Sequence, residues 1–529
     1  MSGAGALLSI EGLTVALPAG GDRPHAVEDV TMALSPGEIL CIVGESGSGK
    51  SVAVGAAMGL LPPSLRVAAG RIMLEGQDVL RFSAAELRAL RGARIGMVFQ
   101  EPMTALNPLM RVRDQVAEVM EVHGVPVGRR VTELLEAVGL PDPAAIARAY
   151  PHQLSGGQRQ RVMIATALAL EPAVLIADEP TTALDVTTQM QILRLIRDLR
   201  QRRGTGVLFV THDFGVVAEI ADRVAVMQKG RVVEQGPAAA VLDAPQHPYT
   251  QQLIAAVPHR PPGRRAPVPG PPLLELVGVT KTYRGRRAAP AVQDATLRIA
   301  RGETLGLVGE SGSGKSTLAR CVVRLVRPEG GAIRFDGTDL QPLSRRGWAP
   351  YRKRIQMVFQ DPASSLNPRR RVGDIVAEGL VTHGMPRAAA RARAAELLRL
   401  VQLEPGAAER FPHEFSGGQR QRIGIARALA LEPELLIADE PVSALDVSVQ
   451  AQVLAMLEEL RTRLNLTMLF ITHDLRVAAQ VCDRLAVMRR GVIVEQGPTA
   501  DVFARPAHDY TRALLDSIPG QRGAGTPRP

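Results

Sequence analysis

The chain has 529 residues, too many for one hydrophobic core, so we expect two to four domains. Its 46% hydrophobic and 22% charged residues are typical of a soluble globular protein, and no run of 18 uncharged apolar residues could span a membrane. Three cysteines without a C-x-x-C pair argue against a disulfide framework and a cysteine-ligated metal cluster. The net charge of +10 comes from 58 arginines and only five lysines, which we interpret as compositional bias rather than a nucleic-acid-binding surface. The first residues show no secretory signal, so we expect a reduced, cytosolic protein.

The first strongly predicted strand is the apolar run Ile39–Val43, and the glycine-rich stretch GESGSGKS follows it at residues 44–51. This context fits the phosphate-binding loop G-x-x-x-x-G-K-[ST], in which backbone N–H groups surround a phosphate. Lys50 would supply a positive charge to the β- and γ-phosphates, and Ser51 a hydroxyl to Mg²⁺. The same eight residues recur at 309–316, after a second apolar run, Thr304–Val308. A chance match in both places is negligible.

A segment with helical periodicity lies between Gln100 and Ser155, for example at Val131–Leu140. We expect it to form a helical subdomain inserted into an α/β core. It ends at LSGGQRQR, and the second half carries FSGGQRQR around Ser416. Ser-Gly-Gly before a helix offers a hydroxyl and backbone N–H groups to an anion.

Two carboxylates end the next predicted strand, Ala173–Asp178, where LIAD is followed by Glu179. The second half repeats LIADEP with Asp439 and Glu440. At the carboxyl end of a sheet strand, the first acid can reach a Mg²⁺ shell and the second can polarise a water for attack on the γ-phosphate. An acidic helix cap would explain one carboxylate but not both.

The rest of the core alternates a predicted helix, Gln189–Arg200, with a predicted strand, Val207–Asp213. From Ser155 onward the two halves align without a gap at an offset of 261 residues, so a whole domain is duplicated. Residues 258–272 are mostly proline, arginine and glycine and predict an extended spacer. We therefore expect an α/β fold of two domains, at 1–257 and 273–529, each with a parallel-sheet core, the inserted helices and a short C-terminal extension.

These motifs together resemble the ATP-binding subunits of ABC transporters, and the resemblance covers nearly the whole chain. It implies P-loop, RecA-like cores in which LSGGQ is the signature motif, and two domains that meet head to tail. Each ATP then lies between the phosphate loop of one domain and the signature of the other, which would explain why one chain carries two of each motif. The resemblance also implies ATP and Mg²⁺ as cofactors.

The resemblance assigns roles to residues that match the family's motifs. The catalytic residues would be Glu179, Glu440, His212, His473, Gln100 and Gln360. Nucleotide in the first loop and signature would contact Gly44, Glu45, Ser46, Gly47, Ser48, Gly49, Lys50, Ser51, Ser155, Gly156, Gly157 and Gln158. Their counterparts are Gly309, Glu310, Ser311, Gly312, Ser313, Gly314, Lys315, Ser316, Thr317, Ser416, Gly417, Gly418 and Gln419, with Tyr283 stacking on adenine. Mg²⁺ would contact Ser51, Gln100, Asp178, Ser316, Gln360 and Asp439, and the aspartate loops would be 183–185 and 444–446.

Two features narrow the resemblance to importers of oligopeptides and dipeptides. The glutamine loops read QEPMTALNP from Gln100 and QDPASSLNP from Gln360, and each half ends in a tail containing PYT or DYT after EQGP. The family then implies two ATPase subunits fused in one chain, working with two transmembrane permeases and an extracytoplasmic solute-binding protein at the cytoplasmic face of the inner membrane. Some relatives bind iron–sulfur in this extension, but no cysteine lies in 245–272 or 500–529, so we expect none here.

The alternative class is a soluble tandem ABC protein that acts on ribosomes or DNA. A ribosome-acting protein usually has a long charged linker, and a repair ATPase has cysteine-rich zinc modules; the short proline-rich spacer and three scattered cysteines fit neither. Eight of ten histidines pair across the repeat without metal-ligand spacing, and only His212 and His473 match a family motif. One difference separates the halves: Leu17 stands opposite Tyr283, so the first half would lack an aromatic ring for adenine unless another side chain covers the base.

Overall fold

The computed structural model of the chain describes residues 5–18, 20, 23–181, 184–257, 263, 265, 270–283, 290–443 and 445–519. The chain forms two compact units. The first holds the chain up to Leu184 together with residues 188–257, and the second holds the chain that follows residue 257, up to Ile518. The predicted duplication of one α/β domain is confirmed.

The strands of the first unit are β1 (Leu8–Ala16), β2 (His25–Leu34), β3 (Ile39–Val43), β4 (Arg66–Leu74), β5 (Gln77–Asp78), β6 (Ile95–Val98), β7 (Val174–Asp178), β8 (Gly206–Thr211), β9 (Arg223–Gln228) and β10 (Arg231–Pro237). Its helices are α1 (Lys50–Ala57), α2 (Ala84–Leu90), α3 (Pro102–Ala105), α4 (Val112–Val122), α5 (Arg130–Ala137), α6 (Pro143–Arg148), α7 (Gly156–Ala167), α8 (Val186–Arg203), α9 (Phe214–Ile220), α10 (Ala238–Asp243) and α11 (Pro248–Ala256).

The strands of the second unit are β11 (Pro272–Thr282), β12 (Pro290–Ala300), β13 (Thr304–Val308), β14 (Gly330–Phe335), β15 (Thr338–Asp339), β16 (Ile355–Val358), β17 (Leu435–Asp439), β18 (Thr467–Thr472), β19 (Arg484–Arg489) and β20 (Val492–Pro498). Its helices are α12 (Lys315–Val322), α13 (Arg345–Trp348), α14 (Tyr351–Arg354), α15 (Pro362–Ser365), α16 (Val372–Thr382), α17 (Arg387–Leu400), α18 (Gly417–Leu429), α19 (Val447–Leu464), α20 (Leu475–Val481), α21 (Thr499–Ala504) and α22 (Asp509–Asp516).

A six-stranded sheet forms the centre of each unit. The strand order is β10-β9-β3-β8-β7-β6 in the first unit and β20-β19-β13-β18-β17-β16 in the second, so corresponding strands occupy corresponding places. All neighbouring strands are parallel except β9 with β10 and β19 with β20, which are antiparallel. Every residue of β3, β7 and β8 is buried, as expected for strands covered on both faces. Because these strands are parallel, the loops that follow β3, β7 and β8 emerge at one edge of the sheet.

A second, antiparallel sheet was not anticipated. Strands β2-β1-β4-β5, and β12-β11-β14-β15 in the second unit, form four-stranded sheets of their own. Buried residues of β1 alternate with partly exposed ones only until the register shift after Ile10, where Gly12 lies with φ 58°. This irregularity hides the strand's period of two from a reading of the sequence.

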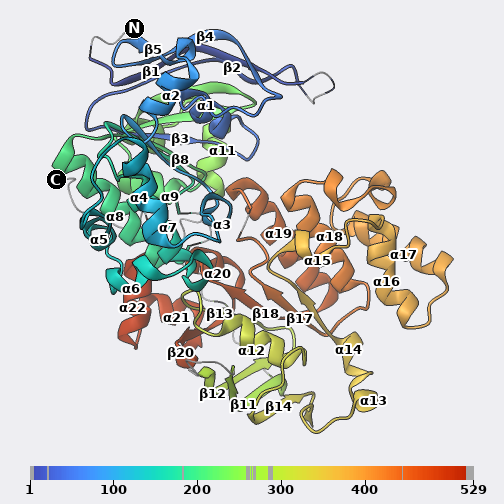
Figure 1. The fold of residues 1–529 in the computed structure, drawn as a ribbon. Coiled ribbons are helices and arrows are strands. Elements are labelled where there is room, and N and C mark those ends of the chain that lie inside the picture. Colours follow the sequence, from blue (N-terminus) through green and yellow to red (C-terminus); the bar gives the residue numbers. More distant parts are fainter. Residues whose placement is uncertain are drawn as a thin grey trace. The chain divides into compact units, whose positions relative to one another are not determined.

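The inserted helical subdomain is present in both units. Helices α4, α5 and α6 pack on one another, and α4 and α5 also pack on α7 (Figure 1). In the second unit α16 and α17 pack on each other and on α18. The helix expected at Val131–Leu140 is α5, which ends three residues earlier than predicted. The predicted strand Val207–Asp213 ends at Thr211, because the Asp213 carboxylate accepts the Gly215 N–H at 2.8 Å and begins α9.

The spacer expected at 258–272 falls largely outside the described residues, and β11 already begins at Pro272. One described spacer residue is held firmly: the Arg265 guanidinium donates to the carbonyl of Val481 at 3.0 Å and to Asp483 at 3.2 Å, both in the second unit. None of the helices within the described residues combines the length and apolar character needed to cross a bilayer.

Candidate nucleotide sites

Each phosphate-binding loop connects a buried strand to a helix. The first runs from the end of β3 to Lys50, the first residue of α1, and the second from β13 to Lys315 on α12. Gly44 has φ 154°, and a Cβ there would lie 2.3 Å from the Met227 carbonyl oxygen. At Gly309 the corresponding distance, to the Met488 carbonyl, would be 2.1 Å. Both loops therefore need glycine at this position because β9 or β19 approaches too closely for a side chain.

The loop lysines are buried and point back along the loop. Lys50 Nζ donates to the carbonyls of Gly44 at 2.7 Å and Glu45 at 2.8 Å. Lys315 Nζ makes the same two bonds, to Gly309 at 2.8 Å and Glu310 at 2.9 Å. Burial lowers the pKa of Lys315, and nearby carboxylates oppose that shift. Both ammonium groups are thus fixed over the strand end, where the motif requires a cation for phosphate.

The predicted Mg²⁺ ligands meet in each unit. Ser51 Oγ donates to Asp178 Oδ1 at 3.1 Å, and Ser316 Oγ donates to Asp439 Oδ1 at 3.0 Å. Burial raises the pKa of both aspartates above its usual value of 3.8, so a bound cation would relieve unfavourable burial of charge. A hydroxyl beside a carboxylate suits Mg²⁺, which binds one or two protein oxygens together with phosphate and water. The residues present fit this cofactor.

The second carboxylate of each pair is held by two neighbours. Gln100 Nε2 donates to Glu179 Oε2 at 2.9 Å, while His212 Nδ1 lies 3.4 Å from Glu179 Oε1. In the second unit Gln360 donates to Glu440 at 2.9 Å, and His473 Nδ1 lies 3.3 Å from Glu440. The glutamine follows β6 or β16 and the histidine follows β8 or β18, so three strand ends supply each cluster.

The backbone is strained at the two glutamates that carry these carboxylates. Glu179 and Glu440 both have φ 47°, in the left-handed region that non-glycine residues rarely adopt. Their amides donate to the carbonyls of Val210 and Ile471, each at 3.0 Å. Such strain costs roughly 1–3 kcal/mol and persists where the surroundings fix the backbone. It directs each carboxylate toward its glutamine and histidine rather than along the strand.

His473 and Glu440 of the second unit shift each other's pKa. Burial alone would raise the pKa of Glu440, but the hydrogen bond and charge of His473 outweigh it and lower that pKa. Conversely, the pKa of His473 is raised, because Glu440 outweighs the effect of its burial. The carboxylate therefore stays ionised beside a histidine that readily takes a proton.

The signature motifs cap helices at the surface of their own units. The Ser155 hydroxyl accepts the Gln158 N–H at 3.3 Å, and the Ser155 N–H donates to Gln158 Oε1 at 2.9 Å. Ser416 and Gln419 form the same capping box. The third residue must be glycine because a Cβ at Gly157 would lie 2.7 Å from Thr188. In the second unit, a Cβ at Gly418 would lie even closer to a side chain, 2.3 Å from Val449.

Sequence reasoning missed one contact between the C-terminal tail and the phosphate loop. The hydroxyl of Tyr249, on α11, accepts the backbone N–H of Glu45 at 3.2 Å. The hydroxyl of Tyr510, on α22, accepts that of Glu310 at 3.1 Å. Both tyrosines are buried. The recurrence of PYT and DYT at the same offset was the available signal, but nothing in the sequence indicates the partner.

The remaining predicted residues are placed as follows. Ser48 and Ser313 lie buried within their loops, and Tyr283 is 45% exposed at the end of β11. His247 and His508 each accept a backbone N–H at the start of the tail helix, and His123 and His383 line the helical subdomain. Residues 182–183 and 444 lie outside the described residues, so the two aspartate loops are only partly described. The pairing of one unit's loop with the other unit's signature stays a prediction.

Comparison with known proteins finds two family models that match the chain and solved cassettes that resemble it. The ABC transporter family model matches residues 27–182 and 292–443. A model of the oligopeptide/dipeptide transporter C-terminal region matches 233–287 and 494–527. A solved dimeric structure of the ATP-binding cassette MJ0796 with ADP and Pi is 32% identical over 43% of this chain and 98% of its own, with a TM-score of 0.40.

Relatives resemble the chain over almost its whole length. It is 49% identical to the peptidoglycan transport ATP-binding protein YejF of Agrobacterium fabrum, covering 96% of each chain. It is 47% identical to the glutathione import ATP-binding protein GsiA of Salmonella typhimurium, covering 97% of this chain and 89% of the relative. The chain therefore belongs to the ABC transporter family, as an ATPase with two cassettes in tandem that each carry an oligopeptide/dipeptide transporter C-terminal region.

Proposed function

We propose that this chain couples ATP hydrolysis to import of di- or oligopeptides or related compounds, and that it supplies both ATPase domains of the transporter. The observation that carries the proposal is that both units hold an intact set of loop lysine, aspartate, glutamate, glutamine and histidine in the same contacts. The oligopeptide/dipeptide transporter C-terminal regions support peptides or related compounds as the cargo. The relatives that act in import support import as the direction of transport.

The chemistry follows from the arrangement around Glu179 and Glu440. Each carboxylate would accept a proton from a water as its oxygen attacks the γ-phosphorus, while the bond to the β-phosphate oxygen breaks and ADP leaves. Gln100 and His212 hold Glu179 in position, as Gln360 and His473 hold Glu440. Mg²⁺, held by Ser51 with Asp178 and by Ser316 with Asp439, would neutralise phosphate charge when bound.

Two composite sites are proposed. Ser416, Gly418 and their neighbours in the second signature would complete the site of Lys50, and Ser155 and Gly157 would complete that of Lys315. The exposed, capped helix ends of both signatures suit this role, because N–H groups at a helix start favour an anion.

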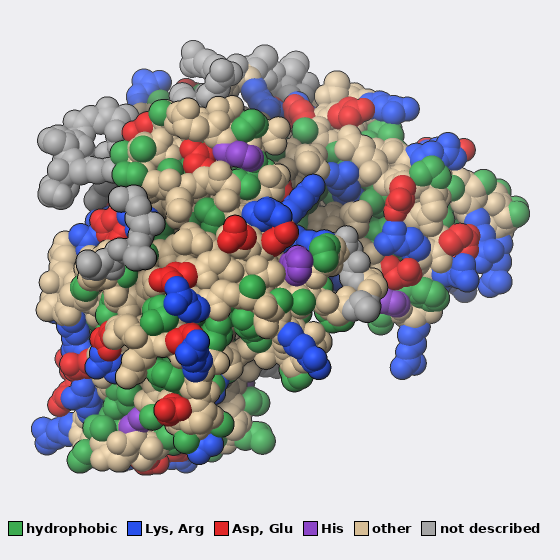
Figure 2. All heavy atoms as spheres, turned by 90° about the horizontal axis from the view of Figure 1, so that it is seen from above, with side chains coloured by type: hydrophobic (Ala, Val, Ile, Leu, Met, Phe, Trp, Pro, Cys, Tyr) green, Lys and Arg blue, Asp and Glu red, His purple; other side chains and the backbone are tan. Residues whose placement is uncertain are grey.

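The proposed partners are two transmembrane permeases and a solute-binding protein, with the chain at the cytoplasmic face of the inner membrane. Nucleic acid is not expected. Figure 2 shows Lys and Arg interspersed with Asp and Glu over the face that it draws, which favours compositional bias over a single basic surface there.

Purification of the tagged chain from membranes tests the assembly. Two polytopic membrane proteins should co-purify, and co-sedimentation with ribosomes instead would overturn the proposal. Cysteine cross-linking refines the test, since the glutamine-loop regions from Gln100 and Gln360 should each receive a cytoplasmic helix of a permease. Cysteines at Met103 and Ser364 should cross-link to permeases, whereas failure at both, with a working control pair elsewhere, would exclude this architecture.

A further inference from the structure

An ion pair lies directly before Tyr283, the residue expected to stack on adenine in the second unit. Lys281 Nζ donates to the Glu329 carboxylate, and the same carboxylate accepts the backbone N–H of Thr282 at 2.8 Å. Lys281 Nζ also lies 5.6 Å from the centroid of the Tyr283 ring, within the range of a cation–π contact. One carboxylate therefore holds both residues that precede Tyr283 in the chain.

Glu329 stands where the main-chain pairing between β11 and β14 ends. The last pair in that register is Thr280 opposite Gly330, and the Glu329 N–H donates to the Thr280 carbonyl at 2.9 Å. Beyond this point the Glu329 side chain, rather than the backbone of the neighbouring strand, accepts the Thr282 N–H. Because a charged acceptor makes a stronger hydrogen bond than a neutral one, this contact fixes the end of β11.

The two charges of this pair are held close to the phosphate-loop helix. The hydrogen bond from Lys281 is the main cause that lowers the pKa of Glu329, and the bond from the Thr282 N–H adds to it. The Lys281 side chain is only 14% exposed. Both charges reach Cys321 on α12: burial raises the pKa of this thiol to about 11, Lys281 opposes the shift and Glu329 adds to it. Helix α12 begins with Lys315, so the pair lies near the helix that carries the loop lysine.

The two units can be aligned here by a contact that they share. In each unit a threonine hydroxyl accepts the N–H of an aspartate on the next strand, Thr14 from Asp29 at 3.1 Å and Thr280 from Asp294 at 3.2 Å. Counted from these threonines and from their partners on the neighbouring strand, Val15 corresponds to Lys281 and Ala68 to Glu329.

The first unit holds the same strand end by different means. Its main-chain pairing of β1 with β4 continues as far as Ala16 opposite Arg66, beyond the point where pairing ends in the second unit. Val15 is buried and Ala68 is exposed, and neither side chain can form an ion pair. The Glu329 contact therefore belongs to the unit that carries the aromatic ring.

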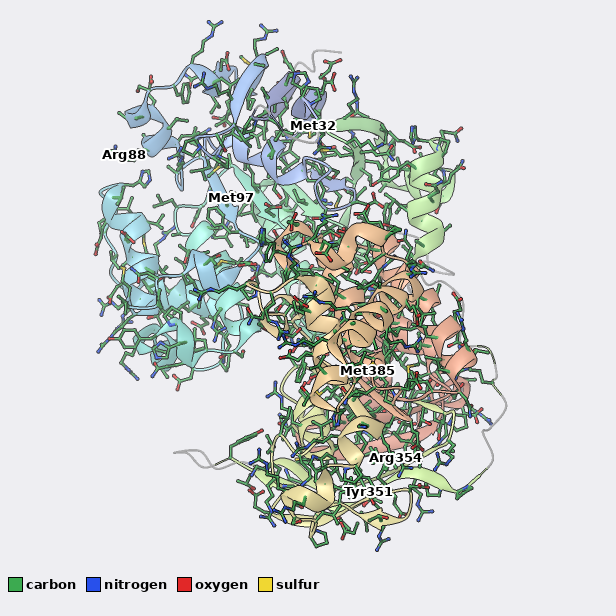
Figure 3. All side chains as sticks on the ribbon, turned by 90° about the vertical axis from the view of Figure 1, so that its right-hand side faces the viewer. Met32, Arg88, Met97, Tyr351, Arg354 and Met385 are labelled. Atoms are coloured by element: carbon green, nitrogen blue, oxygen red, sulfur yellow. The ribbon has the colours of Figure 1, made fainter. Side chains whose placement is uncertain are left out.

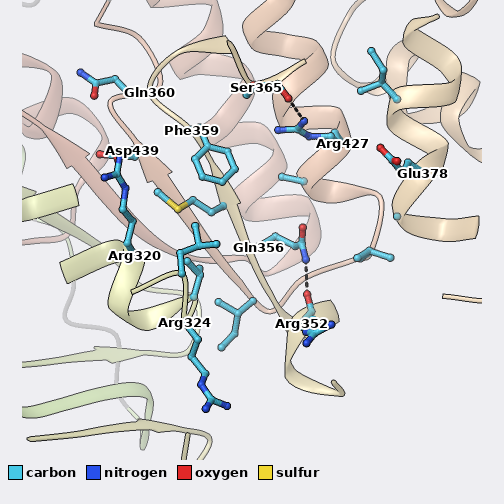
Figure 4. Close-up of a pocket in the computed structure, with 18 of the residues that line it drawn as sticks. Arg320, Arg324, Arg352, Gln356, Phe359, Gln360, Ser365, Glu378, Arg427 and Asp439 are labelled. Carbon is cyan, nitrogen blue, oxygen red and sulfur yellow. Dashed lines mark hydrogen bonds between the residues drawn. The ribbon is translucent and has the colours of Figure 1, made fainter. Parts of the chain in front are cut away.

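The ion pair is separate from the groups proposed to act in hydrolysis. Gln360 and Asp439 lie beside a pocket of about 1110 Å³ (Figure 4). Neither Lys281 nor Glu329 is among the described residues that line this pocket. A substitution of Glu329 therefore leaves the hydrolytic groups in place, and its effect should be seen in nucleotide binding.

We propose that Glu329 is a positioning residue of the second nucleotide site, where with Lys281 it fixes the end of β11 so that the Tyr283 ring stacks on the base. The inference rests on nucleotide binding at the Lys315 loop, which the proposed function requires. An aromatic ring has two faces, so Lys281 over one face leaves the other for adenine. Without the carboxylate the strand end is free to move, and ordering the ring then lowers the affinity for the nucleotide.

Nucleotide binding to the full-length chain tests this role. Lys50→Ala silences the first loop, Glu440→Gln prevents turnover at the second, and ATP is compared with tripolyphosphate, which has no base. Glu329→Ala introduces the residue that the first unit has at this place. It should weaken ATP binding by about 3- to 10-fold, a part of the stacking contribution, and leave tripolyphosphate binding unchanged. Glu329→Gln keeps an acceptor for the Thr282 N–H and should lose less.

Combination with Tyr283→Leu separates positioning from general destabilisation. In that background Glu329→Ala should cause no further loss of ATP affinity, because the ring that it positions is gone. Glu275→Ala is the matched control on the same strand: it removes ion pairs with Arg298 and Arg334 and should leave ATP affinity as it was. Arg354→Met, at a residue labelled in Figure 3, removes an ion-pair cluster elsewhere in the unit. It should lower thermal stability without changing the ratio of ATP to tripolyphosphate affinity.

Three outcomes would overturn the inference: unchanged ATP affinity in Glu329→Ala, equal weakening of ATP and tripolyphosphate, or an undiminished effect of Glu329→Ala in the Tyr283→Leu chain. Failure of the chain to co-purify with permeases, together with the expected binding pattern, would instead contradict only the transport proposal.

Discussion

The hydroxyl of Tyr510 accepts a hydrogen bond from the backbone amide of Glu310, so the C-terminal tail directly supports the phosphate loop. The Arg489 guanidinium lies 4.8 Å from the ring centroid of Tyr510, and burial raises the pKa of this phenol to about 12, which keeps it neutral at physiological pH. Tyr249 makes the equivalent bond to Glu45, and Gln228 stands at the position of Arg489 in the repeat. The tail thus contacts the phosphate-binding loop in each unit.

Removing this hydroxyl should loosen the loop without unfolding the unit. In Tyr510→Phe the ring and its packing remain, but the Glu310 amide loses a hydrogen bond worth about 1 kcal/mol. We expect the KM for ATP to rise a few-fold with a smaller change in kcat, and Tyr249→Phe to act likewise on the first site. Tyr351→Phe, which keeps its ring contacts with Trp348, is the matched control. An unchanged KM in both tail variants would mean that the contact has no role in binding.

Both sites are predicted to hydrolyse ATP. Glu179→Gln and Glu440→Gln each remove the proton acceptor but keep a side chain that Gln100 or Gln360 can contact. We expect turnover at the altered site to fall by roughly 10²–10⁴-fold, with nucleotide binding retained. Single-turnover hydrolysis and ATP binding on each variant measure the two effects separately. Wild-type rates of ATPase and transport in either single variant would exclude that unit from catalysis.

The motif residues could be placed from sequence because parallel strands end at one edge of the sheet. Lys50, Asp178 and His212 lie far apart in the chain, yet each follows a wholly buried apolar strand, and the structure brings the strand ends together. Burial on both faces makes such strands conspicuous. The role of each residue still depended on resemblance, and the contacts now give those roles a geometric basis.

Other features could not be predicted because they depend on tertiary contacts. The antiparallel sheet escaped notice because a bulge interrupts the alternation of β1. The bond between Tyr510 and Glu310 joins residues 200 positions apart.

An ion-pair cluster should make the second unit sensitive to acid. Arg301 and Arg354 both bind Asp336 and Glu434, and the hydrogen bonds from Arg354 in particular lower the pKa of both carboxylates. The charged pairs therefore stabilise the folded state above the usual carboxylate pKa near 4, and this contribution is lost as the pH falls through the lowered values. The groups are largely exposed, so solvent screening limits the whole cluster to about 1 kcal/mol.

Arg354→Met tests this cluster. The variant should unfold at a lower temperature than wild type at pH 7, and the difference should shrink as the pH falls below about 4. Arg512→Met, which removes an exposed pair with Asp509, is the control and should show little difference at any pH. A gap between wild type and Arg354→Met that stays constant down to pH 2 would contradict the electrostatic origin.

The two sites are predicted to differ in ATP affinity because Leu17 stands opposite Tyr283 in the repeat. Tyr283 is 45% exposed, so its aromatic ring is accessible to a base, whereas Leu17 offers only apolar contact. Stacking of a base on an aromatic ring is worth roughly 1–3 kcal/mol in nucleic-acid binders. The Lys50 site should therefore bind ATP more weakly than the Lys315 site, by a few-fold to tens of fold. Nucleotide titration of the full chain, with Glu179→Gln and Glu440→Gln combined to prevent turnover at both sites, should resolve a tighter and a weaker site. Leu17→Tyr should tighten the weaker one, and Tyr283→Leu should weaken the other. Equal affinities that neither swap alters would mean that another side chain covers the adenine in the first unit.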